Sequence, residues 1–326
     1  MKEKVRYAFT LVLLALFLGN APARTEEKQN PEAIKHYNAG VEFTRSGDFA
    51  KAVKEYQKSL ELDPENVQTL YGLGLAHRQL NQLDEAILFL GKAVKINPRY
   101  VDAYYELGLA YWMQKKYDES INQFITVTNF GPEAGSKYTK AYYSLGRLHY
   151  AKKDLEQAQE SLQMAVALDP EYVDAHYYLG EVFREQKELT SSIEAYRQAV
   201  ALDSSHDQAF YKLGSVYKED GQYEEAVEAY KKVIQLKSKW AADSRYRLAV
   251  VYNAMGRLQD AVTMAQEYLK RKPSDAKALM ALGEAYEGLG QHREAIAAYT
   301  KAAQDSRWNQ YATHKIKELK ESLEEE

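Results

Sequence analysis

Residues 101–134 read VDAYYELGLAYWMQKKYDESINQFITVTNFGPEA, and this stretch contains the pattern that decides the fold. Two segments of about a dozen residues each carry apolar side chains at helical spacing, and a short polar turn separates them. Asp118 and Glu119 stand at the start of the second segment, where the helix dipole favours acidic side chains. The stretch therefore predicts a helical hairpin, made of a first and a second helix.

The same pattern recurs along the chain at a nearly constant interval. One tyrosine of the first helix is found seven times, at intervals of 34, 34, 38, 34, 34 and 35 residues: Tyr37, Tyr71, Tyr105, Tyr143, Tyr177, Tyr211 and Tyr246. Such a period predicts a solenoid, in which each copy buries its apolar face by stacking on its neighbours. We divide the chain into eight repeats, namely 33–66, 67–100, 101–134, 139–172, 173–206, 207–240, 242–275 and 276–309. The extra residues 135–138 form either a hinge or a longer loop.

The third repeat resembles the tetratricopeptide repeat (TPR) family, whose pattern is W-x₂-L-G-x₂-Y, then A-x₃-F, then P. The matching residues are Tyr104, Leu107, Gly108, Tyr111, Ser120, Phe124, Val127 and Pro132. The resemblance implies an all-α fold, a right-handed superhelical solenoid of helix-turn-helix hairpins. It also implies that the first helices line a concave wall where partners bind. Close packing predicts that the glycine of the repeat pattern, which is Gly108 in this repeat, faces small residues of the second helix.

Both ends of the chain depart from the repeat pattern. Residues 1–23 contain three cations, an apolar run over residues 8–18 and an A-x-A site, which together predict a signal peptide. The run is shorter than the ~20 residues that span a bilayer, and an uncleaved membrane anchor is the alternative. Residues 24–32 are expected to form a tether. Residues 310–326 carry Ala312, Ile316, Leu319 and Leu323 at helical spacing and predict a capping helix, with a coiled-coil partner site as the alternative.

Composition and motifs exclude several classes of function. A formal net charge of −4 provides no basic field for nucleic acid or for an acidic membrane surface. The chain has no cysteine, which excludes disulfides and thiolate metal sites. Neither H-E-x-x-H, a Walker-type loop nor G-x-S-x-G occurs, and histidines such as His77 and His176 occupy aromatic packing positions. We therefore expect no catalysis, no cofactor and no metal.

The exposed positions of the first helices give the candidate binding groove. It contains the seven tyrosines, which serve equally well as packing residues, and the more informative neighbours Leu75, Leu109, Trp112, Met113, Arg147 and Tyr150. An aromatic and apolar cluster with a nearby arginine has the composition of a protein-binding hot spot, although Trp112 and Met113 could instead pack locally in the turn. The Lys and Asn pair of the family's carboxylate clamp is absent from the first repeats, which have Tyr37 and Val41 at those positions.

These observations predict an extracytoplasmic, non-catalytic scaffold, periplasmic or secreted, that holds a protein or an extended peptide in its concave groove. Contact with a membrane is expected through an uncleaved N-terminal segment alone. The alternative function is that of a structural subunit of an envelope machine for polysaccharide or pili, with sugar rings stacking in the aromatic groove. Neither the partner nor the oligomeric state follows from the sequence.

Overall fold

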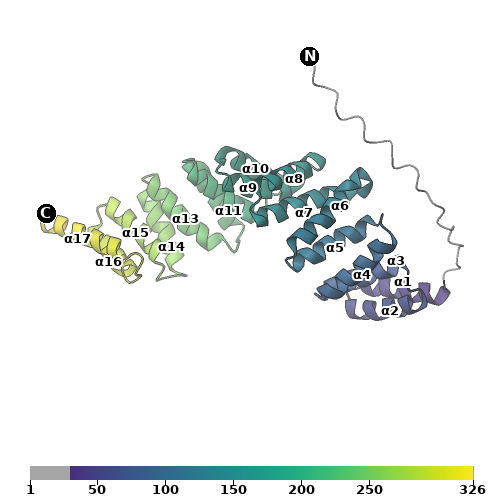
Figure 1. The fold of residues 1–326 in the computed structure, drawn as a ribbon. Helices are drawn as coiled ribbons and strands as arrows, with labels where there is room; N and C mark the ends of the chain where they lie inside the picture. Colours follow the sequence, from purple (N-terminus) through teal and green to yellow (C-terminus); the bar gives the residue numbers. More distant parts are fainter. Residues whose placement is uncertain (1–29, 326) are drawn as a thin grey trace, which may run out of the picture. The chain divides into compact units, whose positions relative to one another are not determined.

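The computed structural model describes residues 30–325, so the predicted signal peptide and most of the predicted tether lie outside the described residues. Within this range the chain forms α-helices and one short 3₁₀ helix, η1 (Figure 1). Their bounds are α1 Pro31–Arg45, α2 Phe49–Leu62, α3 Val67–Gln79, α4 Leu83–Ile96, α5 Val101–Met113, α6 Tyr117–Asn129, η1 Gly131–Ala134, α7 Ser136–Lys152, α8 Leu155–Leu168, α9 Val173–Glu185, α10 Leu189–Leu202, α11 Asp207–Glu219, α12 Tyr223–Gln235, α13 Ala241–Ala254, α14 Leu258–Leu269, α15 Ala276–Gly288, α16 His292–Ala302 and α17 Asn309–Glu325.

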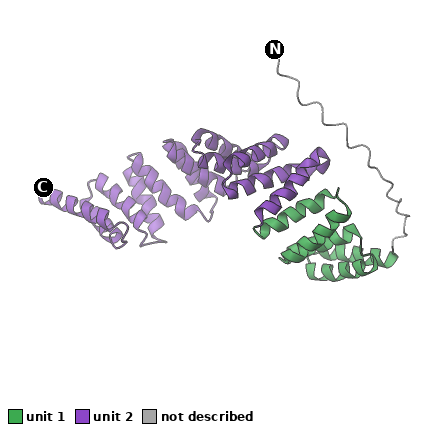
Figure 2. Ribbon diagram, viewed as in Figure 1, with its two compact units in different colours: residues 1–115 green, residues 116–326 purple. Residues whose placement is uncertain are grey.

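The chain divides into two compact units, and the division falls between Lys115 and Lys116 (Figure 2). Unit 1 contains α1 to α5 and unit 2 contains α6 to α17. The boundary therefore lies in the turn of the third repeat, whose two helices belong to different units. Residues 135–138 lie inside unit 2, and the prediction that they form a hinge or a longer loop is wrong for 136–138, which are the first turn of α7. The preceding helix η1 packs against both α6 and α7.

Within each unit, consecutive helices pack against one another as hairpins, and each second helix also packs on the first helix of the next repeat. First helices are neighbours as well: α1, α3 and α5 in unit 1, and α7 with α9 and α13 with α15 in unit 2. This arrangement confirms the predicted all-α stack of helix-turn-helix hairpins. The face of the first helices that carries the seven tyrosines is called the inner wall below.

The hairpin turns share one backbone feature. In all eight repeats the residue between the two helices has a positive φ: Gly47, Asn81, Lys115, Lys153, Lys187, Gly221, Gly256 and Gly290. The residue that follows donates its N–H to a carbonyl near the end of the first helix, for example Glu188 to Phe183 at 2.9 Å. This pairing is the Schellman motif, which satisfies the last carbonyls of a helix and favours glycine in the left-handed position. Three of the turns nevertheless carry lysine there.

The motif glycines make room for a large side chain of the second helix. A Cβ atom added to Gly180 would lie 2.6 Å from a ring carbon of Tyr196, and one added to Gly40 would lie equally close to Tyr56. The predicted small partners are buried beside these rings, but the ring itself occupies the space over the glycine. A helix pair packed at interior density cannot accommodate both a Cβ and a ring at this point.

Repeat 7 reverses this arrangement. Ala249 replaces the glycine, and Ala265 stands where the other repeats have Tyr, Leu or Phe; both alanines are fully buried. The large side chain of this repeat is Tyr268, one helical turn further along α14, where its ring packs at 5.7 Å from that of Tyr246. The substitution of Gly by Ala is thus matched by a smaller partner on the second helix.

The last helix, α17, covers the end of the stack. Ala312 and Leu319 are buried and pack in one cluster with residues of α15 and α16. Lys315 Nζ donates to Glu287 Oε1 at 2.8 Å. Burial alone would raise the pKa of Glu287, but the hydrogen bonds from Lys315 and the Tyr299 hydroxyl lower this pKa below its usual value. Apolar packing and an ion pair therefore hold α17 in place as a capping helix.

Candidate functional site

Three of the four inner-wall tyrosines of unit 2 are more deeply packed than those of unit 1. Tyr143, Tyr177 and Tyr211 are at most 9% exposed, whereas Tyr37, Tyr71, Tyr105 and Tyr246 are half-buried. Most of these rings pack on an aromatic residue that precedes the next first helix; the pairs are Tyr71 with Tyr100, Tyr143 with Tyr172, Tyr177 with His206 and Tyr211 with Trp240, at 4.8 to 5.2 Å between ring centroids. These tyrosines therefore act as spacers between repeats.

Their hydroxyl groups also connect one repeat to the next. Gln208 Nε2 donates to the Tyr177 hydroxyl at 2.7 Å. The Tyr211 hydroxyl donates to Asp243 and accepts from Arg247 Nε, the latter at 2.6 Å. Burial raises the pKa of Tyr177 and Tyr211, so both hydroxyls stay protonated at neutral pH and can donate. The tyrosines thus contribute to the stack in unit 2 more than they offer free surface.

The apolar residues predicted beside the tyrosines remain partly accessible in unit 1. Leu75 lies on α3, and Leu109, Trp112 and Met113 lie on the neighbouring helix α5. Three of these side chains are half-buried, and Met113 is 46% exposed. Unit 1 therefore presents apolar side chains from two adjacent first helices.

The other two predicted residues, Arg147 and Tyr150, belong to unit 2. Both are half-buried on α7. The guanidinium of Arg147 lies over the rings of Tyr143 and Tyr178, at 5.4 and 4.9 Å from their centroids. Such cation–π contacts hold the side chain against the wall. The cluster predicted from the sequence is thus divided between the two units.

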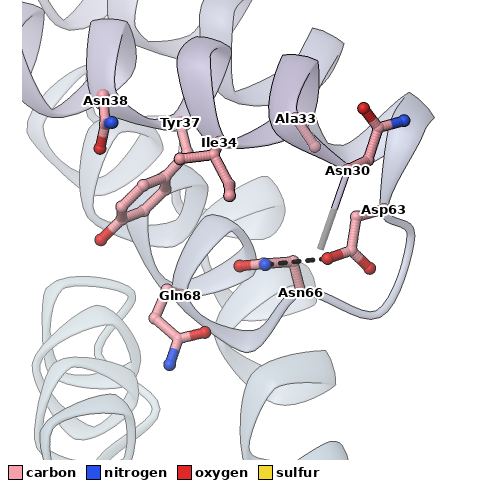
Figure 3. Close-up of a pocket in the computed structure, with 8 residues that line it drawn as sticks. All are labelled: Asn30, Ala33, Ile34, Tyr37, Asn38, Asp63, Asn66 and Gln68. Carbon is pink, nitrogen blue, oxygen red and sulfur yellow. Dashed lines mark hydrogen bonds between the residues drawn. The ribbon is translucent and has the colours of Figure 1, made fainter. Parts of the chain in front are cut away.

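A pocket of about 190 Å³ opens at the start of unit 1, between α1 and the beginning of α3 (Figure 3). Its lining residues are Asn30, Ala33, Ile34, Tyr37, Asn38, Asp63, Asn66 and Gln68. The Asn66 amide donates to Asp63 Oδ2 at 2.9 Å, and its oxygen accepts from the N–H of Thr69, so this side chain is fixed in place.

The pocket is rich in amide side chains and contains one carboxylate, that of Asp63. The side chains of Asn38 and Gln68 are exposed on either side of Tyr37. Amide groups both donate and accept hydrogen bonds, as the main chain of a peptide requires, and no lysine or arginine lines the pocket to favour a carboxylate. Neither Asn38 nor Gln68 is among the residues predicted from the sequence, although Asn38 directly follows Tyr37 and Gln68 lies three residues before Tyr71, on the same face of α3.

The inner wall of unit 2 contains a buried carboxylate. Glu181 is 6% exposed, accepts a hydrogen bond from the Tyr196 hydroxyl and lies 2.8 Å from Lys212 Nζ. Exposed faces of mixed charge are usually solvated, but the carboxylate of Glu181 is buried. The reason is that Lys212 reaches back from the next first helix and compensates the buried charge.

The part of the chain that the structure describes contains no group of three or more His, Asp or Glu side chains placed to hold a metal ion. His77 is buried and stacks on Phe89 at 5.4 Å between centroids, and His176 Nε2 lies 2.9 Å from the carbonyl oxygen of Pro170. Both rings therefore have packing or hydrogen-bonding roles. No helix among residues 30–325 is long and apolar enough to cross a membrane.

Comparison with solved structures supports the fold. The C-terminal part of a TPR repeat-containing protein from Cytophaga hutchinsonii is 14% identical, with a TM-score of 0.65 over 76% of this chain and 99% of that one. A MamA fragment from Desulfovibrio magneticus RS-1 is 24% identical, with a TM-score of 0.51 over 55% of this chain and 99% of its own. The pilF protein of Pseudomonas aeruginosa is 15% identical, with a TM-score of 0.54 over 63% and 91% of the two chains.

Comparison of sequences identifies the family. The photosystem I assembly protein Ycf3 of Acaryochloris marina is 45% identical over 51 residues, and the match spans 31% of the length of that relative and 15% of this chain. Models described as TPR repeat match residues 40–80 and 74–115. Models described as tetratricopeptide repeat match residues 143–207, 190–243, 217–285 and 276–304. These matches cover more than half of the chain, which therefore belongs to the tetratricopeptide repeat family.

Proposed function

We propose that this protein–protein interaction scaffold works outside the cytoplasm, without catalysis, and holds an extended segment of a partner protein along the inner wall of unit 1. The observation that carries the proposal is the amide-lined pocket around Tyr37 (Figure 3). Asn38 and Gln68 can bond the N–H and C=O groups of a partner's main chain. A main-chain contact of this kind accepts many sequences, so specificity must come from elsewhere.

The apolar side chains of the same unit supply that specificity. Leu75, Leu109, Trp112 and Met113 lie on α3 and α5, and α3 packs on α1, which carries Tyr37 and Asn38. Helices packed ~10 Å apart correspond to about three residues of an extended chain at ~3.3 Å per residue. The three first helices of unit 1 therefore suit a segment of roughly six to nine residues.

The location rests on the N-terminal sequence, whose cations, apolar run over residues 8–18 and A-x-A site are typical of exported proteins. Alkaline phosphatase fused after residue 326 should be active in cells, because this enzyme matures outside the cytoplasm. Replacing Leu13 by Arg should abolish that activity by interrupting the apolar run. Equal activity of both fusions would refute the proposed location.

Site-specific crosslinking tests the binding site. A photoreactive amino acid in place of Met113 should yield one crosslinked polypeptide in intact cells, whereas the same residue in place of Met164, similarly exposed on α8, should not. Replacing Asn38 and Gln68 by Ala should remove the crosslink and leave the melting temperature unchanged, because both side chains are exposed. Crosslinks of equal yield from both positions would contradict the proposed groove.

The double substitution of Tyr105 and Trp112 by Ala gives a second test of the same groove. Partner capture should be lost while thermal stability stays near that of the wild type, since both side chains are only half-buried. A collapse of the melting transition would assign these residues to the core instead.

A polysaccharide ligand, with the chain as a structural subunit of an envelope machine, is the second candidate. The pocket favours it in one respect, because amide groups and the Asp63 carboxylate bond hydroxyl groups and the Tyr37 ring can stack on a sugar face. Glycan-array binding that is lost in Tyr37→Ala, together with the absence of a crosslinked polypeptide from position 113, would establish this function in place of the first.

A further inference from the structure

A second hollow lies in unit 2 on the face of α11 opposite the inner wall. Its volume is about 430 Å³, and it is a shallow depression that is broadly open to solvent. This volume is within the range of sites that hold a ligand side chain or a small molecule. Its floor is apolar and consists of Phe210, Leu213 and Tyr217 from α11, and α12 forms one side.

The hollow borders a small residue of α12. Ala229 lines it, and the corresponding residue of repeat 7 is Met264, which is half-buried against the core. The floor residues are well fixed: Leu213 and Tyr217 are 4% and 9% exposed and belong to the main apolar cluster of unit 2. The surface is therefore a preformed recess, and no movement of the backbone is needed to open it.

The rim of the hollow is acidic. Glu224, Glu225 and Glu228 line it together with a single cation, Lys232. All three carboxylates are exposed. Glu228 forms an ion pair with Lys231 at 3.0 Å, but both side chains are more than half exposed, and a pair of this kind contributes little stability and is readily exchanged.

The opposite side of the hollow does not offset this charge. Glu194 and Arg197 of α10 and Glu225 of α12 all act on the hydroxyl of Tyr217, which places α10 beside the same recess. Glu194 and Arg197 lie 3.9 Å apart and compensate each other. The residues that line the recess therefore combine an apolar floor with a rim of three carboxylates and one ammonium group, which is net negative.

We propose that this recess is a second docking site, independent of the inner wall, for a basic segment of a partner protein that inserts one aromatic or large aliphatic side chain between flanking lysines or arginines. The floor removes the apolar anchor from water, and the rim carboxylates attract the flanking cations. An acidic or neutral segment would meet the same carboxylates without compensation. With one site in each unit, the chain connects two partners.

A synthetic probe tests this site directly. The probe is a fluorescein-labelled peptide with one tryptophan flanked by lysines, and its counterpart has glutamates in place of the lysines. The full chain should bind the lysine probe, measured by fluorescence anisotropy, with an affinity that falls as salt rises, and should not bind the glutamate probe. Ala229→Met fills the recess with the residue that repeat 7 already carries and should weaken binding about tenfold or more.

Charge variants separate the contribution of the rim from that of the floor. Replacing Glu224, Glu225 and Glu228 together by Gln should weaken binding of the lysine probe by about tenfold at low salt. The matched control replaces three exposed glutamates of α17 by Gln, namely Glu318, Glu321 and Glu324, and should leave binding unchanged although the net charge changes equally.

Circular dichroism melts verify that each variant is folded. Binding that is insensitive to Ala229→Met, or that falls equally in the α17 control, would overturn the site. Concentration-dependent self-association of the wild type that disappears in Ala229→Met would assign the recess to a second copy of this chain and would overturn the partner assignment.

Discussion

Lys187→Gly should stabilise unit 2, because Lys187 occupies the left-handed turn position between α9 and α10 with φ = 67°. An L-residue with a Cβ in this conformation costs about 1–2 kcal/mol relative to glycine. Glycine loses more backbone entropy on folding, which offsets about 0.5–1 kcal/mol of that gain. The expected net effect is about 0.5–1 kcal/mol in favour of the variant. Gly47, Gly221, Gly256 and Gly290 already occupy this position in four other repeats.

Urea denaturation followed by circular dichroism measures the effect, read as a shift of the midpoint at constant slope. In a thermal melt, about 1 kcal/mol corresponds to roughly 2–4 °C for a unit of 150–250 residues. Lys187→Ala is the matched control, since it removes the same side chain but keeps the Cβ. The reverse change, Gly221→Ala, should destabilise by about 1 kcal/mol.

The comparison of the two Lys187 variants decides whether the backbone is responsible. If Lys187→Gly and Lys187→Ala are equally stable, the strain of the left-handed turn contributes nothing and the reasoning is refuted. Lys153 is a less suitable position, because its ammonium contacts Glu185 and the ring of Tyr150, and these contacts would be lost as well.

Three further predictions concern the packing of the helices. Gly180→Ala should cost about 1–3 kcal/mol in the wild type and close to nothing in a Tyr196→Ala background. In a double-mutant cycle measured by urea denaturation, the double variant should therefore be less destabilised than the sum of the two single variants, and additive effects would contradict the contact. Lys212→Met should destabilise by up to about 3 kcal/mol at pH 7, because the buried carboxyl group of Glu181 loses the ammonium at 2.8 Å and keeps only the guanidinium of Arg184, 4.0 Å away. An unchanged urea midpoint would show that the Lys212 contact contributes nothing. Since the folded state lowers the pKa of Glu287, its contribution is present above pH ~4.5 and is lost as the pH falls further. The protection factors of α17 amides, that is, their exchange rates relative to the intrinsic rate at the same pH, should therefore fall in acid, and this loss should be absent in Glu287→Gln.

Much of the fold could be predicted from the sequence because the helix caps and turn residues occur at the same spacing as the repeats. Asn30 caps α1 by accepting from the N–H of Glu32 at 3.0 Å, as the Asn-Pro-Glu triplet indicates. The helix pairs and the capping helix α17 likewise follow from spacing. The left-handed lysines do not, since lysine has no preference for positive φ; only the alignment with glycine in other repeats reveals that position.

The candidate sites were less accessible to sequence reasoning because they depend on contacts between repeats. The burial of Glu181 requires Lys212 from the next first helix, 31 residues away. The pocket beside Tyr37 depends on Gln68, which is likewise contributed by the following repeat. Residue types at one position of a repeat cannot indicate which side chain of the next repeat will reach it, and three-dimensional packing decides the outcome.

Repeat 7 has Ala249 in place of the motif glycine and Ala265 in place of the large side chain of the second helix. This matched pair limits where genetic recombination can join one repeat to another. A crossover within a hairpin would join the first helix of repeat 7 to a second helix that carries a ring, which creates a clash at the Cβ of Ala249. The reciprocal product would join a glycine helix to Ala265 and leave a void. Crossovers between hairpins keep each matched pair together. Gene duplication and domain shuffling in this chain should therefore be tolerated at the borders of whole repeats and selected against inside them.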